Sequence, residues 1–356
     1  MAKNMKNSIE QHVWGMTPEG EAVILYTLRN ANGCEVQLCN LGATLTSVKY
    51  PDRNGKVADV VLGYKSFEGY YNDPACAGKS IGRVANRIAN GRMTVEGVEY
   101  NLETNNGPNH LHGGSHGYGT KLWESRVEEN RVVFALTSED GDAGYPGEVN
   151  VEVAYDLDDE NNINILFVAK SDRVTPVNLT NHTYWNLKGE ESGDILDHEL
   201  RLCCSQVLEM NDVQIPTGKH LDVAGTPMDF CDWRRLGDDI AAEFNHIKDF
   251  RGYDHFFVLD DWKPNILQKV AELREKTTGR KVTILSSQAG AMVYTGNWLS
   301  GGCPITKSGG RYADYAGVAI ECQNYPDAVN HDDFPSVLLS PEETYCQKIV
   351  FNLGLE

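Results

Sequence analysis

Five polar segments interrupt an otherwise strand-like sequence and contain residues that could carry chemistry. They are GRVANRIANG (82–91), NHLHGG (109–114), NLTNHTYWNL (178–187), GYDHFF (252–257) and ECQNYPDAVN (321–330). Binding and catalytic residues are disproportionately found on loops that a rigid scaffold positions. These segments are therefore the first candidates for a functional site.

Asn86 and Arg87 lie within an apolar frame in the first segment. An arginine offers a rigid fork of donors, and an asparagine both donates and accepts, so the pair suits a ring of hydroxyl groups. A buried structural arginine that pairs with an acid is an equally good interpretation of these residue types.

His182 in the third segment has amide side chains, Tyr184 and Trp185 as close sequence neighbours. Sugars favour such a mixture, because aromatic rings cover their C–H patches while amides bind their hydroxyls. The alternative interpretation of the segment is an exposed polar turn.

His110 and His112 are separated by one residue in the second segment, and His116 follows. Residues two apart on a strand share a face, so a metal site is conceivable. Because no cluster of cysteines or carboxylates accompanies them, we expect no metal. Contact of a single histidine with a ligand, or histidines satisfied within a turn, are the better interpretations. The adjacent Gly113 and Gly114 predict a close approach of the backbone to another group.

The last two segments contribute carboxylates. Asp254 could accept hydrogen bonds from a ligand, although an Asp in a turn bounded by glycine is common without any function. Glu321 lies in a strand-like run whose alternation places it on one face with Ala319. If that face is buried, Glu321 would be a desolvated and more basic carboxylate suited to a general base; if it is exposed, Glu321 is one solvated acid among many.

The elements that must position these residues are strands. Apolar and polar residues alternate in 34–38, 149–155 and 318–322, which predicts half-buried strands. Turn residues separate short β runs in 94–100 and 270–285, which predicts two hairpins.

Only residues 238–247 have a convincing helical spacing, with acidic residues at the start. Many short strands and almost no helix predict an all-β fold, a large antiparallel β-sandwich. Since no repeat or linker composition divides the chain, we expect one domain over 1–356.

The charge and composition narrow the class of partner. The chain has 32 Lys and Arg against 51 Asp and Glu, a formal charge of −19 that disfavours nucleic acid and anionic membranes and favours a small neutral ligand. The N-terminal residues lack an apolar export signal, and no window approaches the roughly 18 apolar residues of a membrane span. Nine scattered cysteines predict reduced thiols, so we expect a soluble cytoplasmic protein, with no signal for its oligomeric state.

At the five polar segments, the sequence resembles the aldose 1-epimerase family, the galactose mutarotases. The blocks occur in the order typical of the family, and the resemblance continues through YTGNWLSG (294–301) and FPSVLLSPEETY (334–345), so it spans nearly the whole chain. It implies a β-sandwich of the galactose-mutarotase type, with no cofactor and no metal.

The resemblance also implies residue roles. Glu321 falls on the proton acceptor of the family and His182 on its proton donor. The implied sugar-binding residues are Asn86, Arg87, His112 and Asp254, with Tyr184 beside the donor histidine. Many relatives have a sugar-contacting Gln where this chain has Met292, and a Thr where it has Cys322.

The implied activity is interconversion of the α and β anomers of a neutral hexose such as glucose or galactose. Ring opening needs a base near O1 and an acid near O5, which Glu321 and His182 would supply. His182 should begin protonated, and a nearby Asp254 or Glu321 would favour that form.

Three other functions compete with this one. A hexose-6-phosphate 1-epimerase would need a basic cluster for the phosphate, and the segments offer few basic residues beyond Arg87. A glycoside hydrolase would need two carboxylates at the scissile bond. A non-catalytic carbohydrate-binding protein would use the same aromatic and amide groups without an acid/base pair.

Overall fold

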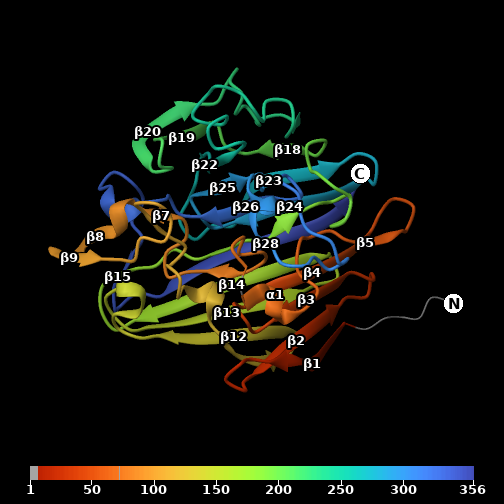
Figure 1. Cartoon of the computed structure of the whole chain (residues 1–356), viewed down its shortest axis with the longest axis horizontal. Coiled ribbons are helices and arrows are strands. Elements are labelled where there is room, and N and C mark those ends of the chain that lie inside the picture. Colours follow the sequence, from red (N-terminus) through yellow and green to blue (C-terminus); the bar gives the residue numbers. More distant parts are fainter. Residues whose placement is uncertain (1–6, 72) are drawn as a thin grey trace.

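The computed structural model describes residues 7–71 and 73–356, which form three main antiparallel sheets (Figure 1). The five-stranded sheet contains, in spatial order, β1 (Ser8–Met16), β2 (Ala22–Arg29), β3 (Glu35–Cys39), β4 (Thr44–Pro51) and β5 (Val57–Asp59). The nine-stranded sheet contains β11 (Glu124–Glu128), β12 (Arg131–Ser138), β13 (Val149–Leu157), β14 (Asn162–Ser171), β28 (Tyr345–Leu355), β24 (Arg280–Ser286), β23 (Gln268–Glu275), β18 (Glu199–Leu202) and β21 (Arg234–Arg235). The six-stranded sheet contains β17 (Tyr184–Trp185), β26 (Val318–Gln323), β25 (Gly290–Tyr294), β22 (Asp254–Val258), β19 (Gln206–Met210) and β20 (Pro216–Asp222).

Short strand pairs and turns complete the fold. The pairs are β6 (Ser80–Ile81) with β16 (Thr180–Asn181), β7 (Arg87–Ile88) with β10 (His110–Leu111), β8 (Arg92–Val95) with β9 (Val98–Asn101), and β15 (Thr175–Pro176) with β27 (Leu338–Leu339). The helical turns are α1 (Phe67–Tyr71), η1 (Ala89–Gly91), η2 (Tyr118–Thr120), η3 (Asp142–Gly144), η4 (Leu299–Gly301) and η5 (Ala328–Asn330). No helix in the described chain has the length and apolarity that crossing a membrane requires.

One large apolar cluster joins the three sheets and confirms the β-sandwich prediction. The cluster takes Val36 from the five-stranded sheet, Val151 and Val153 from the nine-stranded sheet, and Val293 and Ile320 from the six-stranded sheet. Alternate residues of β13 are buried, as its period-2 pattern predicts. Burial of these inward rows is the main stabilising term of a sandwich, at about 25 cal/mol per Å² of apolar area.

The two hairpins predicted from turn residues are confirmed as β8–β9 and β23–β24. By contrast, the half-buried pattern predicted for 318–322 is wrong for one face, because every residue of β26 is buried. β26 lies between β17 and β25, and on its second face Ala319 packs in an apolar cluster while Glu321 lines a cavity.

The helix predicted over 238–247 is wrong, since the chain there forms a series of turns. Asn245 and His246 have positive φ angles of 43° and 63°, which a helix does not allow. The Asn245 side chain instead accepts from the backbone of Met210 and donates to the carbonyl of Leu208. Hydrogen bonds to the six-stranded sheet therefore override a local helical preference.

Candidate active site

A cavity of about 560 Å³ lies against the six-stranded sheet and gathers the predicted site residues. All seven line it, namely Asn86, Arg87, His112, His182, Tyr184, Asp254 and Glu321. They come from segments that are far apart in sequence, so only the folded chain brings them together.

Three neighbouring strands supply the side chains on the sheet side of the cavity. Glu321 on β26 pairs with Met292 on β25, and Tyr294, two residues further along β25, pairs with Asp254 on β22. Paired residues and residues two apart share one face of a sheet, so Glu321, Tyr294 and Asp254 point to the same side. That shared side is the cavity, which settles the burial of Glu321 that the alternation left open.

The opposite wall comes from the first two polar segments, which are bound to each other. The backbone N–H of His112 donates to the carbonyl of Asn86 over 3.1 Å, and the backbone N–H of Asn86 donates to Nδ1 of His112, also over 3.1 Å. Gly113 has a φ of +83°, and a Cβ at this position would lie 2.0 Å from the carbonyl oxygen of Gly82. The close approach predicted from the paired glycines is thus confirmed, and it fixes where His112 enters the cavity.

His182 is held by its own backbone. Its N–H donates to the carbonyl of Lys79 over 2.9 Å, and its carbonyl accepts from the N–H of Gly78 over 2.9 Å. The Tyr184 ring lies 4.9 Å from the imidazole, and the Tyr184 hydroxyl donates to the carbonyl of Ala75. The tyrosine therefore supports the imidazole from the side while its own hydroxyl is occupied.

His182 and Glu321 form a buried acid/base pair, with His182 Nε2 3.3 Å from Glu321 Oε1. Their remaining polar atoms, Nδ1 of His182 and Oε2 of Glu321, are buried and find no hydrogen-bond partner among the described residues. Each such atom costs about 1–3 kcal/mol when it stays unpaired. A hydroxyl-bearing ligand could satisfy polar atoms at this pair, which is the arrangement expected of groups that exchange protons.

Burial sets the protonation of this pair and corrects one expectation. Burial, with a smaller contribution from Asp254, raises the pKa of Glu321 well above its usual range. Burial lowers the pKa of His182 to about 4. The expectation that a neighbouring carboxylate keeps His182 protonated is therefore wrong for the free protein, because burial outweighs that influence and favours neutral His182 beside protonated Glu321.

His112 is a neutral donor that faces the pair. Because its Nδ1 accepts the backbone N–H of Asn86, its hydrogen must be on Nε2. Burial, with a smaller contribution from His182, lowers the pKa of His112 well below its usual range. His112 therefore offers an uncharged N–H to a ligand hydroxyl.

His112, His182 and Glu321 together resemble a metal-ligand set, since one ligand atom from each lies within 4.8 Å of the others. A ligating histidine normally donates its second ring N–H to an acceptor. His112 has the opposite arrangement, because its second nitrogen faces a backbone donor and its hydrogen points toward the cluster. The donor set thus fits a hydroxyl ligand better than a cation.

His110, the other histidine of NHLHGG, lies outside the site. Its ring nitrogens contact the carbonyl of Glu103 over 2.7 Å and the hydroxyl of Tyr145 over 2.8 Å. The idea that His110 and His112 share a face toward one metal is therefore wrong, and His110 is a satisfied structural histidine.

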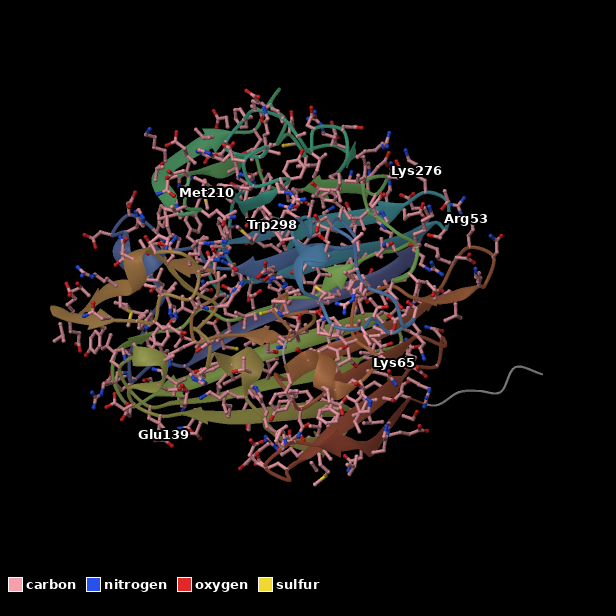
Figure 2. All side chains as sticks on the ribbon, viewed as in Figure 1. Arg53, Lys65, Glu139, Met210, Lys276 and Trp298 are labelled. Atoms are coloured by element: carbon pink, nitrogen blue, oxygen red, sulfur yellow. The ribbon has the colours of Figure 1, made fainter. Side chains whose placement is uncertain are left out.

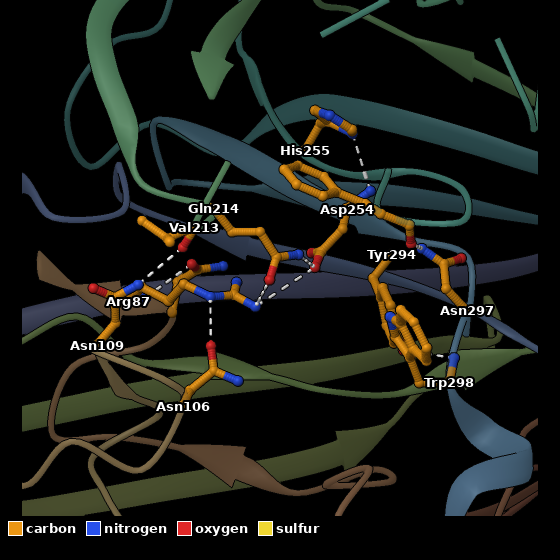
Figure 3. A network of polar contacts seen from close by, with 12 residues as sticks. Arg87, Asn106, Asn109, Val213, Gln214, Asp254, His255, Tyr294, Asn297 and Trp298 are labelled. Atoms are coloured by element: carbon orange, nitrogen blue, oxygen red, sulfur yellow. Dashed lines mark hydrogen bonds and ion pairs between the residues drawn. The ribbon is translucent and has the colours of Figure 1, made fainter. Parts of the chain in front are cut away.

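Arg87, Gln214 and Asp254 form a second polar group in the cavity, which we call the polar clamp (Figure 3). Arg87 Nη2 donates to Gln214 Oε1 over 2.5 Å, and Gln214 Nε2 donates to Asp254 Oδ2. Arg87 Nε also donates to Asn106 Oδ1 over 3.0 Å. Burial raises the pKa of Asp254, while Arg87 and Gln214 oppose this shift.

Sequence reasoning missed several residues that line the cavity, among them Asn106, Gln214, Tyr294, Trp298 and Leu299. Tyr294 and Trp298 do lie within the YTGNWLSG block, and the Tyr294 hydroxyl accepts from the Trp298 backbone N–H over 3.2 Å. Trp298 is exposed near the middle of the face seen in Figure 2. Gln214 lies in the turn between β19 and β20, where no pattern in the sequence marks it as functional.

Met292 and Cys322, the two departures noted from the family pattern, lie beside the site. Met292 packs in an apolar cluster with Phe256 and Tyr325 and is absent from the cavity lining. Cys322 faces the main core on the other side of β26 from Glu321. Neither substitution removes a group from the acid/base pair.

The cavity thus presents a buried carboxylate–imidazole pair beside neutral and charged hydrogen-bonding side chains. The model of the aldose 1-epimerase family matches residues 25–352. The galactose mutarotase of Rattus norvegicus is 39% identical over 95% of this chain and 96% of its own length, and the aldose 1-epimerase of Escherichia coli (strain K12) is 37% identical over 93% and 95%. A solved aldose epimerase homologue from C. elegans has a TM-score of 0.84 at 30% identity, covering 98% of this chain and 99% of that one.

The chain belongs to the aldose 1-epimerase family. It is an isomerase that interconverts aldose anomers. The fold likeness extends to the galactose 1-epimerase of Lactobacillus acidophilus NCFM, with a TM-score of 0.84 at 27% identity over 98% of this chain and 99% of that one.

Proposed function

We propose that this protein interconverts the α and β anomers of a neutral hexose, galactose or glucose, and that Glu321 and His182 transfer the protons. The observation that carries this proposal is the pair itself, buried at 3.3 Å in a cavity lined by hydroxyl-binding groups. Named relatives that act on galactose support the choice of sugar.

The reaction needs one proton on the pair throughout. For ring opening, Glu321 accepts the O1 proton while His182 donates a proton to O5, and the C1–O5 bond breaks to give the open-chain aldehyde. After rotation about C1–C2, His182 takes the proton back from O5 and Glu321 returns a proton to O1 as the ring closes on the other face. Each positioned group contributes about 10²–10⁴ in rate.

The protonation state that burial favours in the free pair has a role in this cycle. Neutral His182 with protonated Glu321 is the state that ring opening produces, and burial favours that state. At the start of a turnover, the O1 hydroxyl donates to Glu321 and O5 accepts from His182. Hydrogen bonds to charged groups favour the charged forms, so the bound sugar itself stabilises the ion pair that opens it.

The remaining residues hold the sugar while C1 stays free to turn. We assign hydroxyl binding to Asn86, Arg87, His112 and Asp254, with Tyr184 supporting His182. Fixing the hydroxyls places O1 and O5 at the pair, and such positioning lowers the barrier without a cofactor.

The charge of the cavity supports a neutral substrate. Among the described lining residues, Arg87 is the one Lys or Arg, and it is already engaged by Gln214 and lies 3.7 Å from Asp254. A phosphate group would also meet the carboxylates of Asp254 and Glu321. A hexose 6-phosphate is therefore a poorer match than the free hexose.

Polarimetry on freshly dissolved α-galactose and α-glucose tests the proposal. The purified protein should bring either rotation to its equilibrium value faster than the spontaneous reaction does. Acceleration with a hexose 6-phosphate alone would overturn the substrate assignment, and release of nitrophenol from a nitrophenyl glycoside would indicate a hydrolase.

We also propose a cytoplasmic location and a single domain over 1–356. All nine cysteines are free, which fits a reducing compartment. One cavity draws its side chains from residues as far apart as Asn86 and Glu321, which favours a single folding unit.

A further inference from the structure

Gln214 occupies a position in the cavity that the acid/base mechanism does not explain. Its amide lies between Arg87 and Asp254 and hydrogen-bonds to both (Figure 3). The direct distance from Arg87 Nη2 to Asp254 Oδ2 is 3.7 Å, which is too long for a hydrogen bond. The amide therefore completes a bridge that the two charged residues do not form alone.

The turn that carries Gln214 is built to hold this amide in place. Gln214 has a φ of +61°, in the left-handed region that few non-glycine residues adopt. The side chain of Asn211 accepts from the backbone N–H groups of Val213 over 3.0 Å and Ile215 over 2.9 Å. Val213 in turn accepts from Asn109 Nδ2 over 2.9 Å, which ties the turn to the NHLHGG segment.

The clamp uses only half of the hydrogen-bonding capacity of Gln214. A glutamine amide has two N–H donors and two acceptor lone pairs. One donor serves Asp254 and one lone pair serves Arg87. Because Gln214 lines the cavity, its second N–H and second lone pair are available to a ligand there.

We propose that Gln214 is a specificity-determining residue, one that orients Arg87 and Asp254 and hydrogen-bonds the same ring hydroxyl that they bind. This inference rests on the proposed function. A site built to hydrogen-bond a hydroxyl rejects an analogue that lacks it, because its buried polar groups are then left unpaired. Gln214 thus makes recognition depend on one hydroxyl of the sugar.

The test combines one substitution with a set of deoxy sugars. Gln214→Met keeps the length of the side chain and removes both hydrogen-bonding groups. Polarimetry gives kcat and KM for wild type and variant on the better of galactose and glucose, and on the 2-, 3-, 4- and 6-deoxy forms of that sugar. Wild-type acceleration on the parent sugar checks the proposed function, and the comparison among deoxy sugars checks Gln214.

We expect Gln214→Met to raise KM on the parent sugar about tenfold, because a factor of ten corresponds to the loss of roughly one hydrogen bond to a charged or hydroxyl group. The value of kcat should change little. For one deoxy sugar, the variant and the wild type should perform alike, because the group that read the missing hydroxyl is gone. Gln214→Ala should reproduce that pattern if Gln214→Met does not fold.

Gln206→Met is the matched control, since Gln206 on β19 makes a similar amide-to-carboxylate bond to Asp222 over 3.0 Å and is absent from the cavity lining. It should leave the kinetic constants unchanged. Unchanged KM in Gln214→Met would overturn the proposal. So would an equal loss on every deoxy sugar, since that result would indicate a purely structural bridge.

Discussion

The acid/base pair and the polar clamp are two buried polar groups in one cavity, and they differ in how completely the protein satisfies them. Glu321 and His182 each keep a buried polar atom without a partner among the described residues. Asp254 and Arg87 are joined through Gln214, and Arg87 is further bound by Asn106. Under the proposed mechanism, the groups that exchange protons are left free for the sugar, whereas the groups that only hold it are fixed beforehand.

The pair and the clamp also differ in what surrounds their carboxyl groups, Glu321 and Asp254. Burial is the largest cause of the raised pKa of both Glu321 and Asp254, and Arg87 opposes the shift at both. Asp254 also accepts a hydrogen bond from Gln214 that opposes its shift, and Glu321 has no such donor among the described residues. Preorganised donors lower the cost of binding, and an unpaired acid or base keeps its reactivity. This comparison predicts that changes to the pair act on kcat and changes to the clamp act on KM.

The largest effect should come from His182→Asn. The variant loses the proton donor to O5, so kcat should fall about 10²–10⁴-fold while KM changes little. Initial rates by polarimetry over a range of galactose concentrations measure both constants, and circular dichroism checks the fold. A variant that lost binding and kept kcat would place His182 with the clamp instead of the pair.

Arg87→Ala should have a smaller and different effect. The variant removes a charged donor from the clamp, so KM should rise about 10- to 100-fold, with a lesser fall in kcat from poorer orientation. Full substrate-saturation curves separate the two constants. If KM stayed at the wild-type value, Arg87 would belong to the scaffold and not to substrate binding.

The pH dependence of kcat/KM should report the pair in the free enzyme. Below the pKa of His182, which burial lowers to about 4, both members carry a proton and no base remains, so activity falls as the pH falls. Above the raised pKa of Glu321, the pair loses its only proton, so activity falls as the pH rises. The two limbs are macroscopic values that the pair shares.

Rates corrected for the spontaneous reaction test this profile. We expect an acid limb near pH 4 and an alkaline limb well above the usual range of a carboxylate. An acid limb near about pH 6.5, the ordinary pKa of histidine, would show that burial does not lower the pKa of His182.

The smallest expected effect is that of a chelator. His112 presents a hydrogen to the cluster and not a lone pair, so excess EDTA should leave kcat and KM unchanged. Incubation with EDTA followed by polarimetry measures this directly. Activity that is lost with the chelator and restored by zinc would mean that His112, His182 and Glu321 bind a metal.

Much of this account could be predicted from the sequence. Period-2 patterns predicted strands of the sandwich. The family motifs indicated seven site residues, and all seven line the cavity. The misses have a common physical cause. The helix over 238–247, the buried second face of β26 and the protonation of His182 all depend on tertiary contacts or burial, which local spacing does not encode.

Gln214 shows the same limit within the site. The residue type of Gln214 and its sequence neighbours are typical of an ordinary turn between two strands. The amide reaches Arg87 and Asp254 only because this turn packs on Asn109. A position of this kind is identified by what it contacts in space.

The most direct test of the central claim compares Glu321→Gln with Asp254→Asn by polarimetry on α-galactose. Both substitutions replace a buried carboxylate with an amide of nearly the same size. Glu321→Gln should lower kcat by about 10²-fold or more at a similar KM, since the amide cannot accept the O1 proton, whereas Asp254→Asn should mainly raise KM. If folded Glu321→Gln kept more than about a tenth of the wild-type kcat, its loss would lie well below the floor for general base catalysis, and the assignment of Glu321 as the base would be contradicted.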